Sequence, residues 1–192
     1  MLLEIFCDGS CWNATIPQPM GLGISYFIGG KHLRKRDKAI EVSVEEAGGH
    51  STSVMAELLA IKAGMESIPE ITESYSRIII RSDNEFAIKV SNGVFSTKLP
   101  HLIPIIEKIK SLIVPGVTVE WVSRNFNRES DDLSRRALGK AVRNYETTKF
   151  SAELKANPEI SYTEFKQNLL KAASKIDKDE EAIKLELKLE NL

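Results

Sequence analysis

The sequence predicts an α/β domain built on a mixed five-stranded sheet, with three antiparallel strands followed by two parallel ones, and flanked by helices. A largely apolar segment and a partner segment with a basic start, joined by a Gly29-Gly30 turn, predict an antiparallel hairpin near the N-terminus. The continuous apolar run Ile78-Ile79-Ile80 is typical of a strand buried on both faces, which favours a parallel and central position. Between them, apolar residues recur at helical spacing over 53–67.

The N-terminal half is expected to form an antiparallel meander. Its first strand alternates apolar residues and ends at Asp8, after which Gly9 and Ser10 are expected to turn the backbone. The other expected segments here are a loop at 13–20, a second strand at 21–30 and its partner strand at 31–47.

The second half is expected to alternate helices and strands. The helix over 53–67 carries one apolar stripe, with Glu57 in its first turn on the flank of that stripe. Asp83 closes the strand that contains the isoleucine run, and Asp131 opens the last helix just after Ser130, a good N-cap residue. The remaining expected elements are helices over 84–91, 100–113 and 130–147, and a strand over 117–122.

The composition indicates one domain with an appendage. The chain has 192 residues, 42% of them hydrophobic, and a net charge of −1. We expect a main domain over 1–148 and a helical, charged C-terminal extension over 149–192. The apolar stripe of the extension, at Phe165, Leu169, Ala172 and Ile176, would pack on the main domain or, alternatively, on a protein partner.

The expected location is cytoplasmic, without a membrane association. No apolar run approaches the roughly 20 residues of a membrane span, and the N-terminus has neither the basic start nor the cleavage site of a signal peptide. Cys7 and Cys11 are expected to be free, half-buried thiols.

Four acidic residues stand at comparable element ends: Asp8, Glu57, Asp83 and Asp131. The carboxyl ends of neighbouring parallel strands meet at one edge of a sheet, where helix N-termini can also lie. Carboxylates crowded there would repel one another unless a cation held them, and Mg²⁺ prefers such hard oxygen ligands. Each acid alone also has a structural interpretation, Asp131 as a favourable charge at a helix N-terminus and Asp83 as a turn residue.

Four segments in the same order resemble the motifs of type 1 ribonuclease H, over residues 1–145. They are Asp8-Gly9-Ser10-Cys11 with Asn13 and Met20-Gly21-Leu22-Gly23; Thr52 to Ala60; Ser82-Asp83-Asn84 through Gly93; and Trp121-Val122 with Asn127 to Ser134, which is similar to Asn-x-x-Ala-Asp-x-Leu-Ala. The resemblance implies a ribonuclease H-like fold.

The resemblance also implies an activity: cleavage of RNA in RNA–DNA hybrids by a two-metal-ion mechanism that leaves 5′-phosphate and 3′-hydroxyl ends. The cofactor would be two Mg²⁺ ions, for which Mn²⁺ can substitute. The implied metal ligands and catalytic residues are Asp8, Glu57, Asp83 and Asp131. The implied nucleic-acid contacts are Gly9, Ser10, Asn13, Thr52, Ser53, Asn84 and Asn127.

Three departures from the family pattern bear on activity. The loop 123–126 lacks the histidine of some members, which predicts slower or altered turnover. Ser53 replaces the usual asparagine. The short connection 93–99 leaves no room for a basic handle, so the substrate must be gripped elsewhere. A basic stripe on the third strand is one candidate, and a solvated hairpin is its alternative interpretation; the stripe is Lys31, Arg34, Lys35, Arg36 and Lys38.

Both Trp12 and the activity itself have alternative interpretations. Trp12 could stack on a base or sugar, or could simply cover the core.

The protein could be a non-catalytic nucleic-acid-binding module of the same fold, although such a module has no need of four crowded carboxylates. It could also be another nuclease of the superfamily, such as an exonuclease or a junction resolvase.

Overall fold

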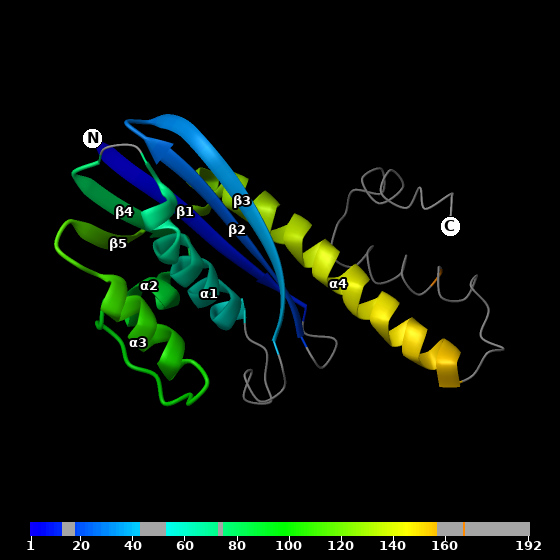
Figure 1. Ribbon diagram of the computed structural model, residues 1–192. Helices are drawn as coiled ribbons and strands as arrows, with labels where there is room; N and C mark the ends of the chain where they lie inside the picture. Colours follow the sequence, from blue (N-terminus) through cyan, green and yellow to red (C-terminus); the bar gives the residue numbers. More distant parts are fainter. Residues whose placement is uncertain (13–17, 43–52, 73–74, 157–166, 168–192) are drawn as a thin grey trace.

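The fold is a five-stranded mixed sheet in the order β3-β2-β1-β4-β5 (Figure 1). The computed structural model describes residues 1–12, 18–42, 53–72, 75–156 and 167. β1 pairs antiparallel with β2 and parallel with β4, as the sequence predicts. The strands are β1 (Leu2–Cys11), β2 (Gln18–Ile28), β3 (Lys31–Val42), β4 (Arg77–Ser82) and β5 (Val117–Trp121).

β1 is longer than predicted, and Asp8 lies within it rather than at its end. The parallel pairing with β4 stops at Phe6 and Arg81, whereas the antiparallel pairing with β2 continues to Cys11 and Met20. The predicted turn at Gly9 and Ser10 is therefore wrong. Asp8 therefore lies beyond the last pair with β4, while its backbone stays in the sheet through its pairing with Gly23 of β2.

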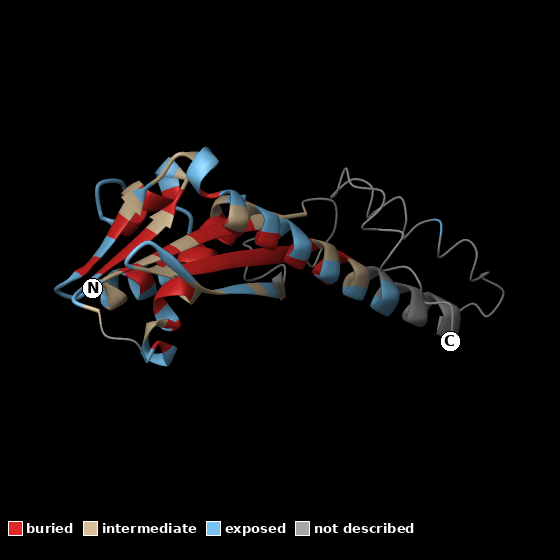
Figure 2. Cartoon of the chain, turned by 90° about the horizontal axis from the view of Figure 1, so that it is seen from above, coloured by how far each residue is buried: buried red, intermediate tan, exposed pale blue. Residues whose placement is uncertain are grey.

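One face of the sheet carries the main hydrophobic core. α1 (Ser53–Glu66) lies on this face, and α2 (Glu85–Ser91) and α3 (Ile103–Leu112) complete the layer. Buried residues run along the strands and along the inward sides of the helices (Figure 2). Ile78, Ile79 and Ile80 are all buried, which confirms the strand predicted from the apolar run.

The opposite face is covered by α4 (Arg128–Ala156), which packs mainly on β1, β2 and β3. It approaches β2 at two glycines: a Cβ on Gly21 would lie 2.0 Å from the Ser134 carbonyl oxygen, and one on Gly23 would lie 2.0 Å from that of Ser130. Only residues without a side chain allow this backbone contact.

α4 differs from its prediction at both ends. It begins at Arg128, so Ser130 is inside the helix and is not its N-cap; the Ser130 hydroxyl instead bonds the Phe6 carbonyl at 3.0 Å. The helix continues through 148 to Ala156, past the predicted end at 147. The division into domains at 148/149 stays a prediction, because residues 157–166 and 168–192 lie outside the described part.

The other elements differ from their predictions by a few residues. β3 ends at Val42, and the rest of the predicted strand, 43–47, is outside the described residues. Two short 3-10 turns, η1 (Ile68–Glu70) and η2 (Arg124–Phe126), complete the described part of the fold. Cys7 and Cys11 are not joined in a disulfide, as expected, although Cys7 is fully buried and only Cys11 is half-buried. None of the described helices is both long and apolar enough to span a bilayer.

Candidate active site

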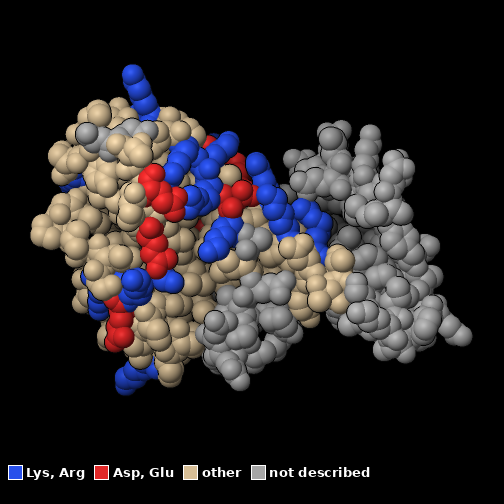
Figure 3. All heavy atoms as spheres, viewed as in Figure 1, with Lys and Arg blue, Asp and Glu red and all other residues tan. Residues whose placement is uncertain are grey.

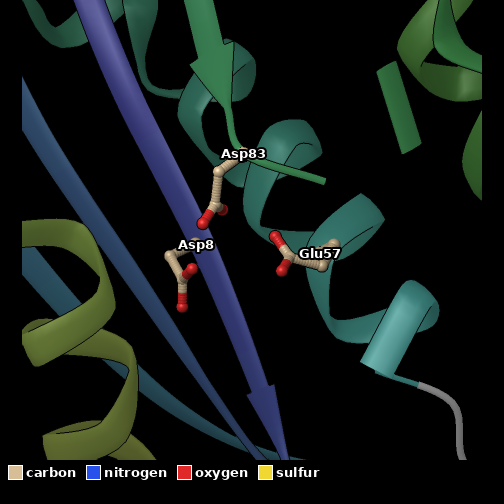
Figure 4. Close-up of side chains that lie close together, drawn as sticks. All are labelled: Asp8, Glu57 and Asp83. Atoms are coloured by element: carbon tan, nitrogen blue, oxygen red, sulfur yellow. The ribbon is translucent and has the colours of Figure 1, made fainter. Parts of the chain in front are cut away.

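Three of the four predicted acids converge at one edge of the sheet (Figure 4). Asp8, Glu57 and Asp83 each offer one carboxylate oxygen, and these oxygens lie within 4.8 Å of one another. They come from β1, from α1 and from the residue after β4. Asp8 is 5% exposed and Glu57 is 8% exposed, so two of the three carboxylates are almost removed from bulk water.

Glu57 is held against β1 by a close contact between α1 and the strand. A Cβ on Gly9 would lie 2.1 Å from the backbone carbon of Ala56, so glycine is needed for α1 to approach this closely. The backbone N–H of Gly9 donates to the Glu57 carboxylate, and the Ser82 hydroxyl donates to Glu57 Oε2 at 3.3 Å. Glu57 lies in the second turn of α1, one residue later than the predicted first turn.

Asp8 is held from the opposite face of the sheet. The hydroxyl of Ser134, a fully buried residue of α4, donates a hydrogen bond to Asp8 Oδ2. The Ser10 hydroxyl lies 2.7 Å from the Ser134 hydroxyl and extends this chain toward the pocket.

Asp83 is oriented by Asn127 and Trp121. Asn127 Nδ2 donates to Asp83 Oδ1 at 3.2 Å and to the Cys7 carbonyl at 3.0 Å, which ties Asp83 to β1. Trp121 Nε1 donates to the Asp83 main-chain carbonyl at 3.1 Å. Asn127 is 1% exposed. This burial argues against its predicted contact with nucleic acid, and its side chain positions an acid instead.

Asp131 lies beside the three acids but is not one of the convergent group. It is in the first turn of α4, where Arg135 Nη2 approaches it at 2.6 Å and Arg124 Nη2 at 3.4 Å. It contacts the same pocket, and its charge raises the pKa of Asp8.

The carboxylates of the group oppose one another's ionisation. Burial first, and then the charges of Asp8 and Asp83, raise the pKa of Glu57 to about 9. Burial raises the pKa of Asp8 to about 6, with the charges of Asp131 and Asp83 adding to the effect and the Ser134 hydrogen bond opposing it. A divalent cation among the three oxygens would remove this repulsion, and hard oxygen donors suit such an ion. The group therefore fits a metal ion.

An open pocket of about 490 Å³ surrounds the group. Four residues predicted to contact nucleic acid line it: Gly9, Ser10, Ser53 and Asn84. Asn84 also caps α2, because its Oδ1 accepts from the Ala87 N–H at 2.9 Å. Asn13 and Thr52 lie outside the described residues.

The sequence interpretation assigned no role to several residues that build the site. Ser82, Ser134, Arg124 and Arg135 all contact one of the four acids. The helical spacing from Asp131 to Arg135 could have predicted an ion pair. The partner of Ser134 comes from another strand, and no local pattern contains it.

The predicted basic stripe on β3 is divided between the two faces of the sheet. Arg36 pairs with Glu70 on the α1 side, with Nη2 and Oε2 2.5 Å apart, whereas Lys35 lies 3.6 Å from Glu129 of α4. The basic stripe therefore does not form one surface. Trp12 packs on Leu138 and Val142, as its interpretation as a cover predicts, and it also contacts the pocket.

The sequence matches a known protein family. The family described as reverse transcriptase-like matches residues 28–137, more than half of the chain. The chain belongs to this family. With the five-stranded sheet described above, it is a member of the ribonuclease H-like superfamily. The matched residues include Glu57, Asp83 and Asp131. The match begins after Asp8, so the structure alone places Asp8 with the other acids.

Solved structures share the family fold at low sequence identity. Ribonuclease H1 from the archaeon Halobacterium salinarum is 22% identical, with a TM-score of 0.61 over 73% of this chain and 100% of that one. An N-terminal ribonuclease H domain from Mycobacterium tuberculosis is 20% identical, with a TM-score of 0.62 over 75% and 98%. LC11-ribonuclease H1, isolated from compost and solved in complex with an RNA/DNA hybrid, is 23% identical, with a TM-score of 0.61 over 73% and 99%.

Proposed function

We propose that this protein is a metal-dependent endonuclease that hydrolyses the RNA strand of RNA–DNA hybrids. The observation that carries the proposal is the convergence of Asp8, Glu57 and Asp83, whose oxygens lie within 4.8 Å of one another at the base of an open pocket. Buried like charges are unfavourable, so their retention in one place calls for a function.

The proposed cofactor is a pair of Mg²⁺ ions, for which Mn²⁺ can substitute, held by Asp8, Glu57, Asp83 and Asp131. When bound, two such ions supply water activation and charge stabilisation for phosphodiester hydrolysis. The chain's own part is to orient the ligands: Ser134 holds Asp8, Ser82 holds Glu57 and Asn127 holds Asp83. The expected products carry 5′-phosphate and 3′-hydroxyl ends.

The hybrid is the proposed substrate because of the residues at the pocket rim and the similarity to a hybrid-binding structure. Ser10, Ser53 and Asn84 offer short polar side chains that could meet a backbone or a 2′-hydroxyl, the group that distinguishes RNA from DNA. The LC11 structure described above contains such a hybrid.

A second candidate is a catalytically weak or inactive nucleic-acid-binding module of the same fold. The pairing of Asp131 with both Arg124 and Arg135 favours it, because these ion pairs compete with a metal for the carboxylate. The absence of a histidine from the loop 123–126 points the same way. An exonuclease or junction resolvase is a further alternative that substrate comparison would distinguish.

The test is cleavage of a labelled RNA–DNA hybrid with Mg²⁺ or Mn²⁺, beside RNA duplex, DNA duplex and single-strand controls. Asp83→Asn should abolish cleavage, whereas Asp132→Asn, a matched change at an exposed neighbouring acid outside the pocket, should leave it unchanged. Binding of the hybrid without cleavage in either metal would reject the enzyme and favour the binding module. Cleavage of another substrate in preference would identify a different nuclease.

Cytoplasmic location and a protein partner for residues 149–192 remain predictions from the sequence. The protein partner would be tested by comparing the full chain with a variant shortened at 156, the end of α4.

A further inference from the structure

Positive charge is concentrated on the middle of α4. From Leu133 to Tyr145 the helix carries four cationic residues and no acidic one, although the whole chain has a net charge of −1. In Figure 3, positive side chains gather where α4 passes beyond the edge of the sheet. Packing on the sheet accounts for Lys140, which pairs with Asp37 of β3, so the concentration of positive charge on the exposed side of the helix needs another physical reason.

Two other places where a nucleic-acid backbone could be held, the α2–α3 connection and β3, have few cations or have them offset by acids. The connection between α2 and α3, residues 92–102, contains a single lysine, Lys98. On β3, Arg34 and Arg36 lie against Glu70 and Lys35 lies against Glu129, so acids already offset much of the charge of that strand.

Three arginines follow one side of α4 outward from the pocket: Arg128, Arg135 and Arg143, called here the α4 ridge. Arg128 and Arg135 are seven residues apart and Arg143 is eight further on, so all three lie on the same side of the helix. Arg135 contacts the pocket and its side chain is 44% exposed. The guanidinium of Arg143 lies 3.8 Å from where a Cβ on Gly139 would be, and so extends back along the helix toward Arg135.

Lys140, another cation of this stretch and three residues before Arg143, is directed toward β3. Its Nζ is 2.7 Å from Asp37 of β3. Among the residues whose side chains are described, the acids beside the ridge are Asp131, paired with Arg135, and Asp132, which is exposed; Glu146 follows Arg143 by three positions in the sequence. Lys140 therefore offers a cation of the same helix that is separate from the ridge.

We propose that the α4 ridge binds the phosphate backbone of a nucleic-acid duplex at the point where the duplex leaves the pocket. The inference rests on the proposed function, because it assumes that the duplex enters this pocket. Arg128 and Arg143 are about 22 Å apart along the helix axis, which covers roughly six base-pair steps. Guanidinium groups bind phosphate oxygens in two-point fashion, and such contacts position a duplex without reading its sequence.

The test measures binding of labelled duplexes over a range of salt concentrations, in an Asp83→Asn background so that no substrate is cut. Arg143→Ala should weaken binding about threefold, and Arg128→Ala with Arg143→Ala about tenfold. Each arginine removed should reduce the slope of log affinity against log salt by about one. The losses should be alike for hybrid and DNA duplex, because both present phosphates. Lys140→Ala is the matched control and should change little.

The outcomes separate this inference from the proposed function. Equal losses in Arg143→Ala and Lys140→Ala would mean that net charge alone governs binding, and the ridge would be rejected. Cleavage by the wild type with unchanged binding in the double variant would reject the ridge and keep the nuclease. Ridge-dependent binding without cleavage by the wild type would keep the ridge and reject the nuclease.

Discussion

The hydroxyl of Ser134 donates a hydrogen bond to the buried carboxylate of Asp8, across 126 positions of sequence and from the opposite face of the sheet to Glu57. The motif that this segment resembles has alanine where this chain has Ser130 and Ser134. Both hydroxyls bond to β1, but only Ser134 contacts an acid; Ser130 contacts the Phe6 carbonyl. Helix α4 therefore both covers the sheet and orients a candidate metal ligand.

Ser134→Ala should weaken metal binding by about tenfold, because partners that orient ligating carboxylates commonly contribute that much. Calorimetric titration with Mn²⁺ would measure the affinity directly. Ser130→Ala removes a buried hydroxyl four residues away on the same side of α4 and should leave the affinity unchanged. Identical affinities in wild type and Ser134→Ala would show that the hydrogen bond has no part in metal binding.

Asn127→Ala should lower both the free energy of unfolding and the affinity for metal. The Asn127 amide bridges Asp83 and the Cys7 carbonyl in a buried place, so its loss leaves that carbonyl unpaired, at about 1–3 kcal/mol. Urea denaturation would measure the first effect. Asn92→Ala provides the comparison: Asn92 Nδ2 donates to the Val119 carbonyl at 2.8 Å, away from the acids, so only stability should fall.

Stability without metal should decrease as pH rises. The folded-state pKa of Glu57, about 9, lies above its ordinary value of 4.5, so between these values the folded chain holds a proton that the unfolded chain releases. The free energy of unfolding then falls with pH, by at most about 1.4 kcal/mol per unit for one proton. Asp8, whose pKa is about 6, adds to the fall between about pH 4 and 6.

Denaturation in EDTA over a range from about pH 5 to 9 tests this pH dependence. Glu57→Gln should flatten the curve, and excess Mg²⁺ should restore stability at the alkaline end, where the carboxylates are ionised. A wild-type curve that rises through this range would contradict the raised pKa values.

Gly23→Ala should destabilise the fold by about 3 kcal/mol or more, because its Cβ would lie 2.0 Å from the Ser130 carbonyl oxygen and would separate α4 from β2. In Gly139→Ala, a change within α4, the added Cβ meets nothing closer than 3.8 Å. This variant should be more stable than the wild type by about 0.5–1 kcal/mol through helix propensity. Thermal denaturation of the pair would compare them. A neutral Gly23→Ala would mean that the helix is not seated as described.

Asp131→Asn should reduce cleavage less than Asp83→Asn, because Asp131 lies outside the group of three and is shared with two arginines. Single-turnover rates at saturating Mn²⁺ would rank the two variants. If Asp131→Asn were as severe as Asp83→Asn, the Asp131 carboxylate would have to leave its arginines in the working enzyme.

The five strands, three antiparallel and then two parallel, could be predicted from the sequence because apolar periodicity reports which faces are buried, as Ile78–Ile80 illustrates. The position of Asp8 within β1 could not, since it depends on β2 continuing as a partner after β4 has ended. The pairing of Asn127 with Asp83 joins residues 44 apart, and nothing near either residue indicates it. Asp83 and Asp131 stand out by their positions at element ends, but nothing near them in the sequence separates Asp131, which pairs with Arg124 and Arg135, from the group of three.

The close contacts of two helices with the sheet have a consequence for hydrogen exchange. α1 contacts Gly9 on one face of the sheet, and α4 contacts Gly21 and Gly23 on the other. These three glycines lie on adjacent strands, and Gly9 pairs with Leu22 between the other two. Amide protons of β1 and β2 in this stretch should therefore exchange with solvent only when the whole domain unfolds. The most slowly exchanging core of the protein would then coincide with the backbone that carries Asp8, and the acids would be reached by substrate without any opening of that core.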